Sequence, residues 1–167
     1  MPVNYGYLNN EEYKALRKVL GFSQAEAQDF HGLKNIRTIN QWESGRNNTS
    51  ECACNKMTKY SKLMFEHIKD KFFEFRQHRS QPAILLSYKE DETAENLKPV
   101  LEFFPCLSVY KMTIYRAYVE AMNRGFDAHI ITFDSKLYKS YLQALDLEDN
   151  LKTREDWARY HYLKFKR

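Results

Sequence analysis

The sequence predicts a mainly α-helical protein that ends in a small α+β part, and three observations support this prediction. Apolar residues recur at intervals of three and four along most of the first 80 residues, which is the spacing of amphipathic helices. Residues 50–79 contain neither Gly nor Pro and predict one long helix. Only two short runs, 83–88 and 129–133, have the β-rich composition of strands.

The N-terminal part begins with two helices whose ends are marked by capping residues. Asn10 can cap the first helix, and Gly21 ends it. Ser23 and Glu26 form the S-x-x-E capping box of the second helix. This helix ends near Gly32, because glycine fits the left-handed position that closes a helix.

A third helix is predicted from Asn35, as its cap, to Glu43, and Ser44-Gly45 ends it. Tight turns marked by glycine join the three helices, so they can form one small bundle. The apolar residues available as its core are Leu16, Leu20, Phe30, Leu33, Ile39 and Trp42.

The C-terminal part alternates helices with the two strands. A helix is predicted over Ser108–Arg124, ended by Gly125, and another begins after the second strand with Asp134 or Ser135 as its cap. The motif T-R-E-D from Thr153 predicts the start of a final helix.

The chain of 167 residues is long enough for one compact domain or two small ones, and its 43% hydrophobic content supplies a core. We expect a three-helix unit in residues 1–50 and a long connecting helix in 51–80. Residues 81–167 are expected to form an α+β subdomain for dimerisation or partner binding.

Positive charge is concentrated in the N-terminal half. Residues 1–80 hold 13 Lys and Arg against 9 Asp and Glu, and residues 81–167 hold 13 of each. Within 31–62 there are six basic and two acidic residues. Such a patch is typical of proteins that bind polyanions, although lysines also commonly serve only to solvate a surface.

Cysteine usage and hydropathy indicate a cytoplasmic protein. The three cysteines are an odd number, and Cys52 and Cys54 are too close for an ordinary structural disulfide. The first 20 residues have no apolar signal-peptide core, and no segment has 18 consecutive apolar residues. We therefore expect no membrane association.

Two stretches, L-R-K-V-L-G-F-S-Q-A-E-A-Q and T-I-N-Q-W-E-S-G-R, resemble the Cro/lambda-repressor-like (XRE-type) helix-turn-helix family. The resemblance covers about 35 residues and implies a lambda-repressor-like bundle that binds DNA. The matching residues are Leu16, Arg17, Leu20, Gly21, Ser23, Gln24, Gly32, Ile39, Trp42, Glu43, Gly45 and Arg46. Two features depart from the family pattern: one extra residue between Ser23 and Ile39, and Ala27-Gln28 in place of a large apolar residue followed by Ala.

If the third helix enters the major groove, its first turns face the base edges. The expected base-contacting residues are Ile36, Arg37, Thr38, Asn40 and Gln41. Arg37 can donate two hydrogen bonds to guanine, and Asn40 or Gln41 can pair with adenine. Arg37 could instead contact phosphate, and Ile36 could instead belong to the core.

Other residues are expected to fix the register of the helix on DNA without reading the sequence. Gln24 matches a family position that contacts phosphate, and the flanking candidates are Lys34, Arg46, Asn47 and Asn48. Arg17 and Glu43 match a pair that forms an internal salt bridge in the family, and Trp42 is expected in the core.

No catalytic residue, metal site or cofactor is expected. Cys52-x-Cys54 lies on a predicted helix without a second cysteine pair, and Cys106 with His129 lacks an orienting partner. No glycine-rich phosphate-binding loop is present.

A single helix-turn-helix reads few base pairs, so a homodimer is expected, formed by the long helix and the aromatic C-terminal part. The order of elements resembles small bacterial and phage regulators that include anti-CRISPR-associated autorepressors. Two alternatives stay open. The protein could be an antitoxin-like interaction protein, or its C-terminal half could be an enzyme or a sensor of a small ligand, which a polar pocket near the ends of the two strands would favour.

Overall fold

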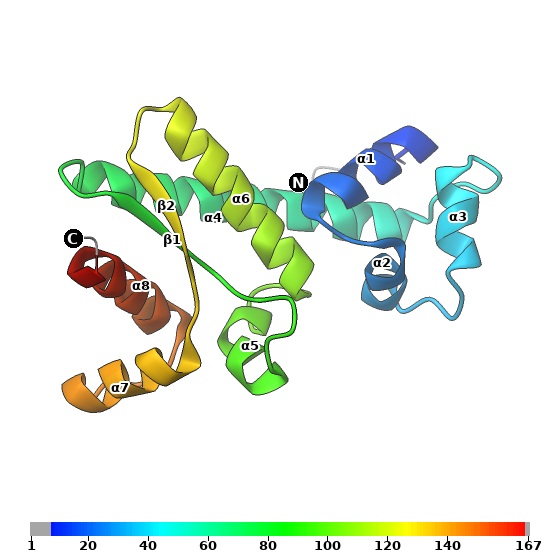
Figure 1. Cartoon of the computed structure of the whole chain (residues 1–167). Helices are drawn as coiled ribbons and strands as arrows, with labels where there is room; N and C mark the ends of the chain where they lie inside the picture. Colours follow the sequence, from blue (N-terminus) through cyan, green and yellow to red (C-terminus); the bar gives the residue numbers. More distant parts are fainter. Residues whose placement is uncertain (1–7, 166–167) are drawn as a thin grey trace, which may run out of the picture. The chain divides into compact units, whose positions relative to one another are not determined.

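Helices make up most of the chain in the computed structural model, which describes residues 8–165 and confirms the predicted mainly α class. The protein divides into two compact units, Met1–Lys69 and Asp70–Arg167. The boundary falls within the long helix α4 (Glu51–Gln77), so this helix contributes residues to both units (Figure 1).

Unit 1 consists of α1 (Asn10–Leu20), α2 (Gln24–His31), α3 (Arg37–Glu43) and the first part of α4. The predicted core is partly confirmed: Leu20, Ile39 and Trp42 are buried, whereas Leu16, Phe30 and Leu33 are half-buried. Further buried side chains of unit 1 lie outside that predicted core list. These are Tyr13, Phe22, Ala27, Ala53, Cys54, Met57 and Met64.

The predicted starts of the first and last helices are wrong by one to three residues. The cap of α1 is Asn9, not Asn10, and its side chain accepts the backbone N–H of Glu12 at 2.9 Å. The final helix, α8 (Leu151–Phe165), begins before Thr153, because Asn150 Oδ1 accepts the Thr153 N–H at 2.9 Å. In both places a neighbouring asparagine provides the cap, and a short side-chain amide serves as well there as a hydroxyl.

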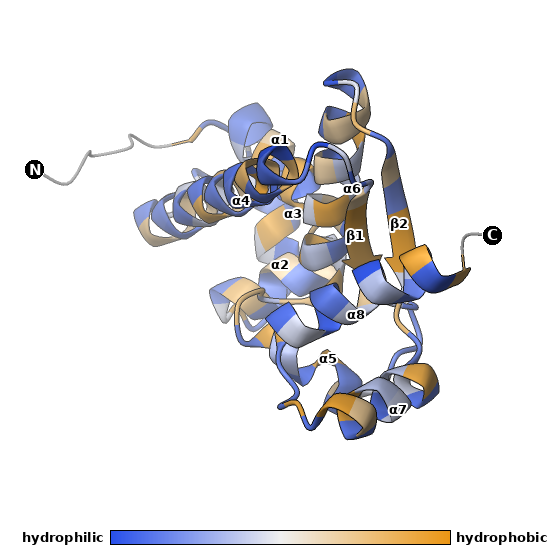
Figure 2. Ribbon diagram, turned by 90° about the vertical axis from the view of Figure 1, so that its left-hand side faces the viewer, coloured by the Kyte–Doolittle hydropathy of each residue, from blue (hydrophilic) through white to orange (hydrophobic). Residues whose placement is uncertain are grey.

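Unit 2 is built around a parallel pair of strands, β1 (Ala83–Ser87) and β2 (Ala128–Thr132), with Ala83 opposite Ala128 and Ser87 opposite Thr132. All five residues of β1 are buried, which requires cover on both faces. The helices α6 (Leu107–Asn123) and α8 supply it from opposite sides of the strand pair (Figures 1 and 2).

The remaining helices of unit 2 are α5 (Ala94–Leu101) and α7 (Ser135–Leu145). No helix over Ala94–Leu101 was predicted from the sequence. Pro99 lies inside α5 and removes one backbone donor, but Thr93 Oγ1 caps the helix by accepting the Asn96 N–H at 3.3 Å. Asp134 caps α7, as predicted, through two backbone N–H groups.

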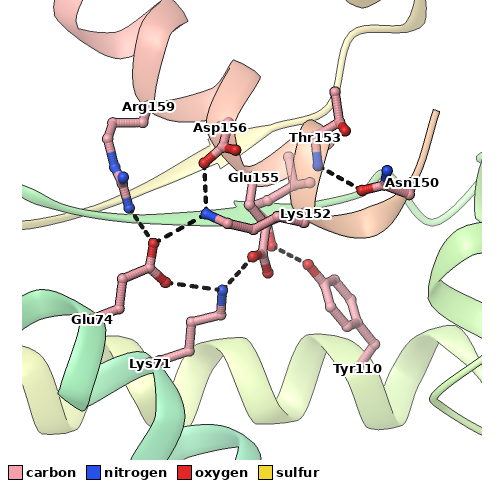
Figure 3. Close-up of polar contacts among 10 residues, drawn as sticks. Lys71, Glu74, Tyr110, Asn150, Lys152, Thr153, Glu155, Asp156 and Arg159 are labelled. Carbon is pink, nitrogen blue, oxygen red and sulfur yellow. Dashed lines mark hydrogen bonds and ion pairs between the residues drawn. The ribbon is translucent and has the colours of Figure 1, made fainter. Parts of the chain in front are cut away.

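Polar contacts join the last part of α4 to α8 within unit 2 (Figure 3). Glu74 accepts hydrogen bonds from Arg159 at 2.7 Å and from Lys152 at 3.4 Å, and Lys71 lies between Glu74 and Glu155. These charges alternate in sign, so each partner is neutralised by its neighbours.

A buried arginine holds the other side of unit 2 together. Arg154 is 2% exposed; it donates to both carboxylate oxygens of Asp149 at 2.7 Å and to the backbone carbonyl of Asn96. Its guanidinium also lies 4.5 Å from the ring centre of Phe133. An arginine fork suits this site because it meets a carboxylate with two parallel bonds.

Candidate nucleic-acid interface

Local hydrogen bonds fix the ends of α2, the turn 32–36 and α3. Ser23 Oγ accepts the backbone N–H of Glu26 at 3.1 Å, and the Glu26 carboxylate accepts that of Ser23 at 2.8 Å, which confirms the predicted capping box. Gly32 closes α2 with φ +67°, a conformation open to glycine at little cost. Asn35, the predicted cap of α3, is not the cap residue: Ile36 takes that place without a side-chain bond. Asn35 Oδ1 still accepts the Arg37 N–H at 2.8 Å, which holds the start of the helix.

The inner face of α3 packs on the other helices of unit 1. Ile39 is fully buried, and Trp42 is 5% exposed. The Trp42 ring meets the Tyr13 ring edge-on with 5.4 Å between centroids, and the His31 ring at 5.8 Å. Edge-to-face aromatic pairs add stability beyond the buried area. The predicted core role of Trp42 is confirmed.

A buried polar cluster sets the position of the end of α3. Arg17, on α1, forms an ion pair with Glu43 and donates to the Phe22 carbonyl at 2.6 Å. Gln24, on α2, donates to the same carboxylate at 2.9 Å. Glu43 therefore joins three segments of unit 1, and the predicted internal pair of Arg17 with Glu43 is confirmed.

The protonation state of Glu43 follows from these partners. Burial by itself raises the pKa of the Glu43 carboxyl, but the hydrogen bonds from Arg17 and Gln24 and the charge of Arg17 outweigh it. The net effect lowers the pKa below its ordinary value. Glu43 thus stays ionised and paired inside the unit.

The outer face of α3 carries polar and cationic side chains. Arg37, Asn40 and Ser44 follow one another at helical spacing, and all three are exposed. Ile36, just before the helix, is 39% exposed, and Gln41 is half-buried beside them. Ser44 was not among the predicted site residues, because its place before Gly45 was interpreted only as the end of the helix.

The loop after α3 is fastened to it through Gln41. The Gln41 carbonyl accepts the N–H groups of Arg46 at 3.0 Å and Asn47 at 3.2 Å. The Asn47 side chain donates to Gln41 Oε1 at 3.1 Å. Arg46, Asn47 and Asn48 are exposed, so the loop presents one cation and two amides next to the end of α3.

The predicted site residues differ in their exposure and in their hydrogen bonds. Lys34 is exposed in the turn before α3, whereas Thr38 is half-buried. Gln24 is half-buried, and its side-chain nitrogen is bonded to Glu43. A phosphate contact by Gln24 would therefore use the second N–H of the same amide, since that nitrogen carries two.

Within the sequence from residue 32 to residue 50, the exposed charges are all positive. Glu43 is the only acidic residue in the sequence between residues 32 and 50, and it is buried and paired. Lys34, Arg37 and Arg46 in the same stretch are exposed. A cluster of exposed cations of this kind attracts a polyanion.

The cysteine and histidine residues do not gather around a metal. Within residues 8–165, no three His, Cys, Asp or Glu side chains are placed to hold an ion. Cys54 is buried and its Sγ accepts the Leu8 N–H at 3.4 Å, while Cys52 is exposed.

Comparison with known proteins adds no relative. No protein-family model matches the chain, and no curated protein matches its sequence. The resemblance to the XRE-type family therefore stays a prediction from the motifs quoted above. Across the part of the chain that the structure describes, every helix is too short or too polar to cross a bilayer.

Proposed function

We propose that this protein is a sequence-specific double-stranded DNA-binding regulator of transcription, acting as a dimeric repressor, and that α3 is its recognition helix. One observation carries the proposal: α3 shows an exposed polar and cationic face, while its only carboxylate is buried with Arg17. The packed inner face and the fixed ends of α3 support it further.

The side chains on this face match the chemistry of the major groove. The Arg37 guanidinium can donate to two acceptors of one guanine, and the Asn40 amide can both donate to and accept from adenine. Lys34 and Arg46 flank these residues and suit phosphate oxygens. The Gln41–Asn47 hydrogen bond holds the Gln41 amide in one orientation before any DNA arrives.

A second copy would give a useful affinity, because dimers contact two half-sites one DNA turn apart. Unit 2 carries an apolar stripe suited to such pairing: Tyr115, Val119 and Met122 recur at helical spacing on α6 and are 42%, 54% and 53% exposed. The three free cysteines, Cys52, Cys54 and Cys106, fit a reducing compartment, and we propose the cytoplasm.

Selection of the full-length protein against a random double-stranded DNA pool tests the proposal directly. We expect an enriched, roughly palindromic site, whose affinity falls steeply between two salt concentrations as phosphate contacts are screened. Arg37→Ala should weaken the enrichment and broaden the set of selected sequences, and Gln143→Ala, an exposed amide change on α7, should leave both unchanged. A pool without enrichment at either salt concentration contradicts the proposal. Light scattering at high micromolar concentration tests the dimer separately.

A further inference from the structure

An open pocket of about 680 Å³ lies in unit 2, where α4 and α6 end and the two strands begin. Three arginines line it: Arg76 and Arg79 from the end of α4 and the segment after it, and Arg124 from the end of α6. The rest of the wall is Ser80, Gln81, Pro82, Gly125, Phe126 and Asp127. The volume is in the range of small-molecule sites.

The two segments that form the pocket are held together by backbone bonds. Ala83 N–H donates to the Asp127 carbonyl at 2.8 Å, and Gln81 N–H donates to the His78 carbonyl at 2.8 Å. Gly125 has φ +77° and no heavy atom within 4 Å of where a Cβ would be. The backbone bonds therefore fix this part of the pocket wall, and the space next to Gly125 is open.

Arg124 is held in place before any ligand binds. Its guanidinium lies 4.6 Å from the ring centre of Phe72 and donates to Glu120 through Nε at 2.7 Å. The Nη2 atom also lies 2.6 Å from Glu120 Oε1, which leaves the two N–H groups of Nη1 available for a ligand. Arg76 and Arg79 are exposed, and they form no ion pair in the part of the chain that the structure describes.

Guanidinium groups bind phosphate by paired, charge-assisted hydrogen bonds. The one carboxylate in the wall, Asp127, is bonded to His129 at 2.9 Å, so it is directed at least partly to that ring. We propose that this pocket binds a small molecule carrying two or more phosphate groups, of the nucleotide class, with Phe126 beside the non-phosphate part. The site does not depend on α3, so it goes beyond the DNA-binding proposal.

Helix ends offer a different reason for basic residues here, since cations near a helix C-terminus stabilise its dipole. Arg76 is in the last turn of α4. If this were the whole role of the arginines, their loss would lower thermal stability and leave ligand binding unchanged. The two roles are therefore separable by measuring both quantities in the same variants.

The experiment is calorimetric titration of the full chain with pyrophosphate and with ADP. We expect saturable binding of both that weakens with added salt. Arg76→Gln/Arg79→Gln should raise the dissociation constants at least about tenfold, as expected for lost charge-assisted bonds. Lys136→Gln/Lys139→Gln on α7 is the matched control, because it removes the same charge at the same spacing in the same unit and should change neither constant. Tighter binding of ADP than of pyrophosphate would support the place given to Phe126.

Three outcomes would overturn the proposal. The first is an absence of saturable binding of either probe at millimolar concentration. The second is equal weakening by the Arg76/Arg79 variant and its lysine control, which would indicate non-specific attraction. The third is a loss of DNA binding in the Arg76/Arg79 variant with no ADP or pyrophosphate binding in the unchanged protein, which would make the pocket a contact for the DNA backbone. A failure of the DNA selection leaves the first two readouts, which are titrations with ADP and pyrophosphate, intact.

Discussion

Tyr13 and His31 share a hydrogen bond inside unit 1, with 3.0 Å between Tyr13 Oη and His31 Nε2. The other ring nitrogen of His31, Nδ1, is buried without a hydrogen-bond partner among the described residues. A protonated imidazole carries a hydrogen on both nitrogens, so a charge on His31 would leave one donor unsatisfied. Burial, with a smaller contribution from the charge of Lys56, lowers the pKa of His31 to about 4.

This low pKa predicts an acid-sensitive unit 1. The unfolded chain takes up a proton near pH 6.5 and the folded chain near pH 4, so the free energy of unfolding should fall as the pH drops between these values. Because the His31 ring is partly exposed, we expect the free energy of unfolding to fall by roughly 1–2 kcal/mol. NMR titration of the imidazole gives the midpoint directly, and His31→Gln should flatten the pH dependence. A midpoint near 6.5 would contradict the prediction.

Breaking the pair of Arg17 and Glu43 should destabilise unit 1 strongly. Arg17→Met leaves a buried carboxylate without its partner, at a cost of about 3–5 kcal/mol. Urea denaturation measures the loss, and the double variant Arg17→Met/Glu43→Leu should recover most of it. Because the pKa of Glu43 is lowered, the pair stabilises the fold above about pH 4.5 and is lost as the pH falls through the folded value. Equal stabilities for the single and double variants would rule out this account.

The network around Glu74 should contribute to stability where an exposed pair does not. Burial opposes the charge of Glu74, but the Arg159 hydrogen bond and the nearby lysines lower its pKa to about 2. Glu74→Gln should therefore lower the free energy of unfolding by about 1 kcal/mol at neutral pH. This difference should shrink as the pH falls from 4.5 to 2. Glu66→Gln on the same helix is the control, since Glu66 is 65% exposed and its one ion pair among residues 8–165 is with Lys69 at 3.4 Å. Similar unfolding midpoints in the two variants would refute the distinction.

Arg37 and Arg46 should play different roles on DNA. Arg37→Ala is expected to weaken the selected site by about 1–3 kcal/mol and to relax specificity, because a base contact is lost. Arg46→Ala should weaken all sequences alike and reduce the salt slope by about one, because a phosphate contact is lost. Fluorescence anisotropy with the selected site and a scrambled site separates the two, and an identical profile for both variants would contradict these assignments.

The loop after α3 should matter for specificity more than for affinity. Asn47→Ala frees Gln41 Oε1 from its 3.1 Å hydrogen bond, so the Gln41 amide can turn to suit more than one base. We expect a broader set of selected sequences from Asn47→Ala and a small change in affinity for the best one. Asn48→Ala, the neighbouring exposed amide, serves as the control. A set unchanged from that of the original protein would show that Gln41 is held by other contacts.

Features that depend on local rules were predictable from the sequence. The Ser23 capping box, the glycine ends of α1 and α2 and the long helix follow from spacing and side-chain chemistry. The helix α5 was not predicted; a proline inside it is atypical of a helix, and Thr93 is its one clear start signal. Pairing of Ala83 with Ala128 is a long-range contact that no local pattern encodes.

In the candidate sites too, local features were predictable from the sequence and long-range contacts were not. The exposed face of α3 followed from helical periodicity, whereas the inward direction of the Gln24 amide depends on the position of Glu43. The arginine pocket could not be predicted, because Arg76 and Arg124 are far apart in sequence and come together only in the folded unit 2. Basic residues just after two helix ends were the one signal available.

The parallel pairing of β1 with β2 also bears on the order in which the protein forms. Strand partners such as Ala83 and Ala128 are about 45 residues apart in sequence, and one covering helix, α8, lies later still. Unit 1 closes with nearer neighbours, as from Tyr13 to Trp42. Contacts between distant residues slow folding, and chains fold from the N-terminus during synthesis. We therefore expect the recognition helix to be folded on a nascent chain while unit 2 is still incomplete.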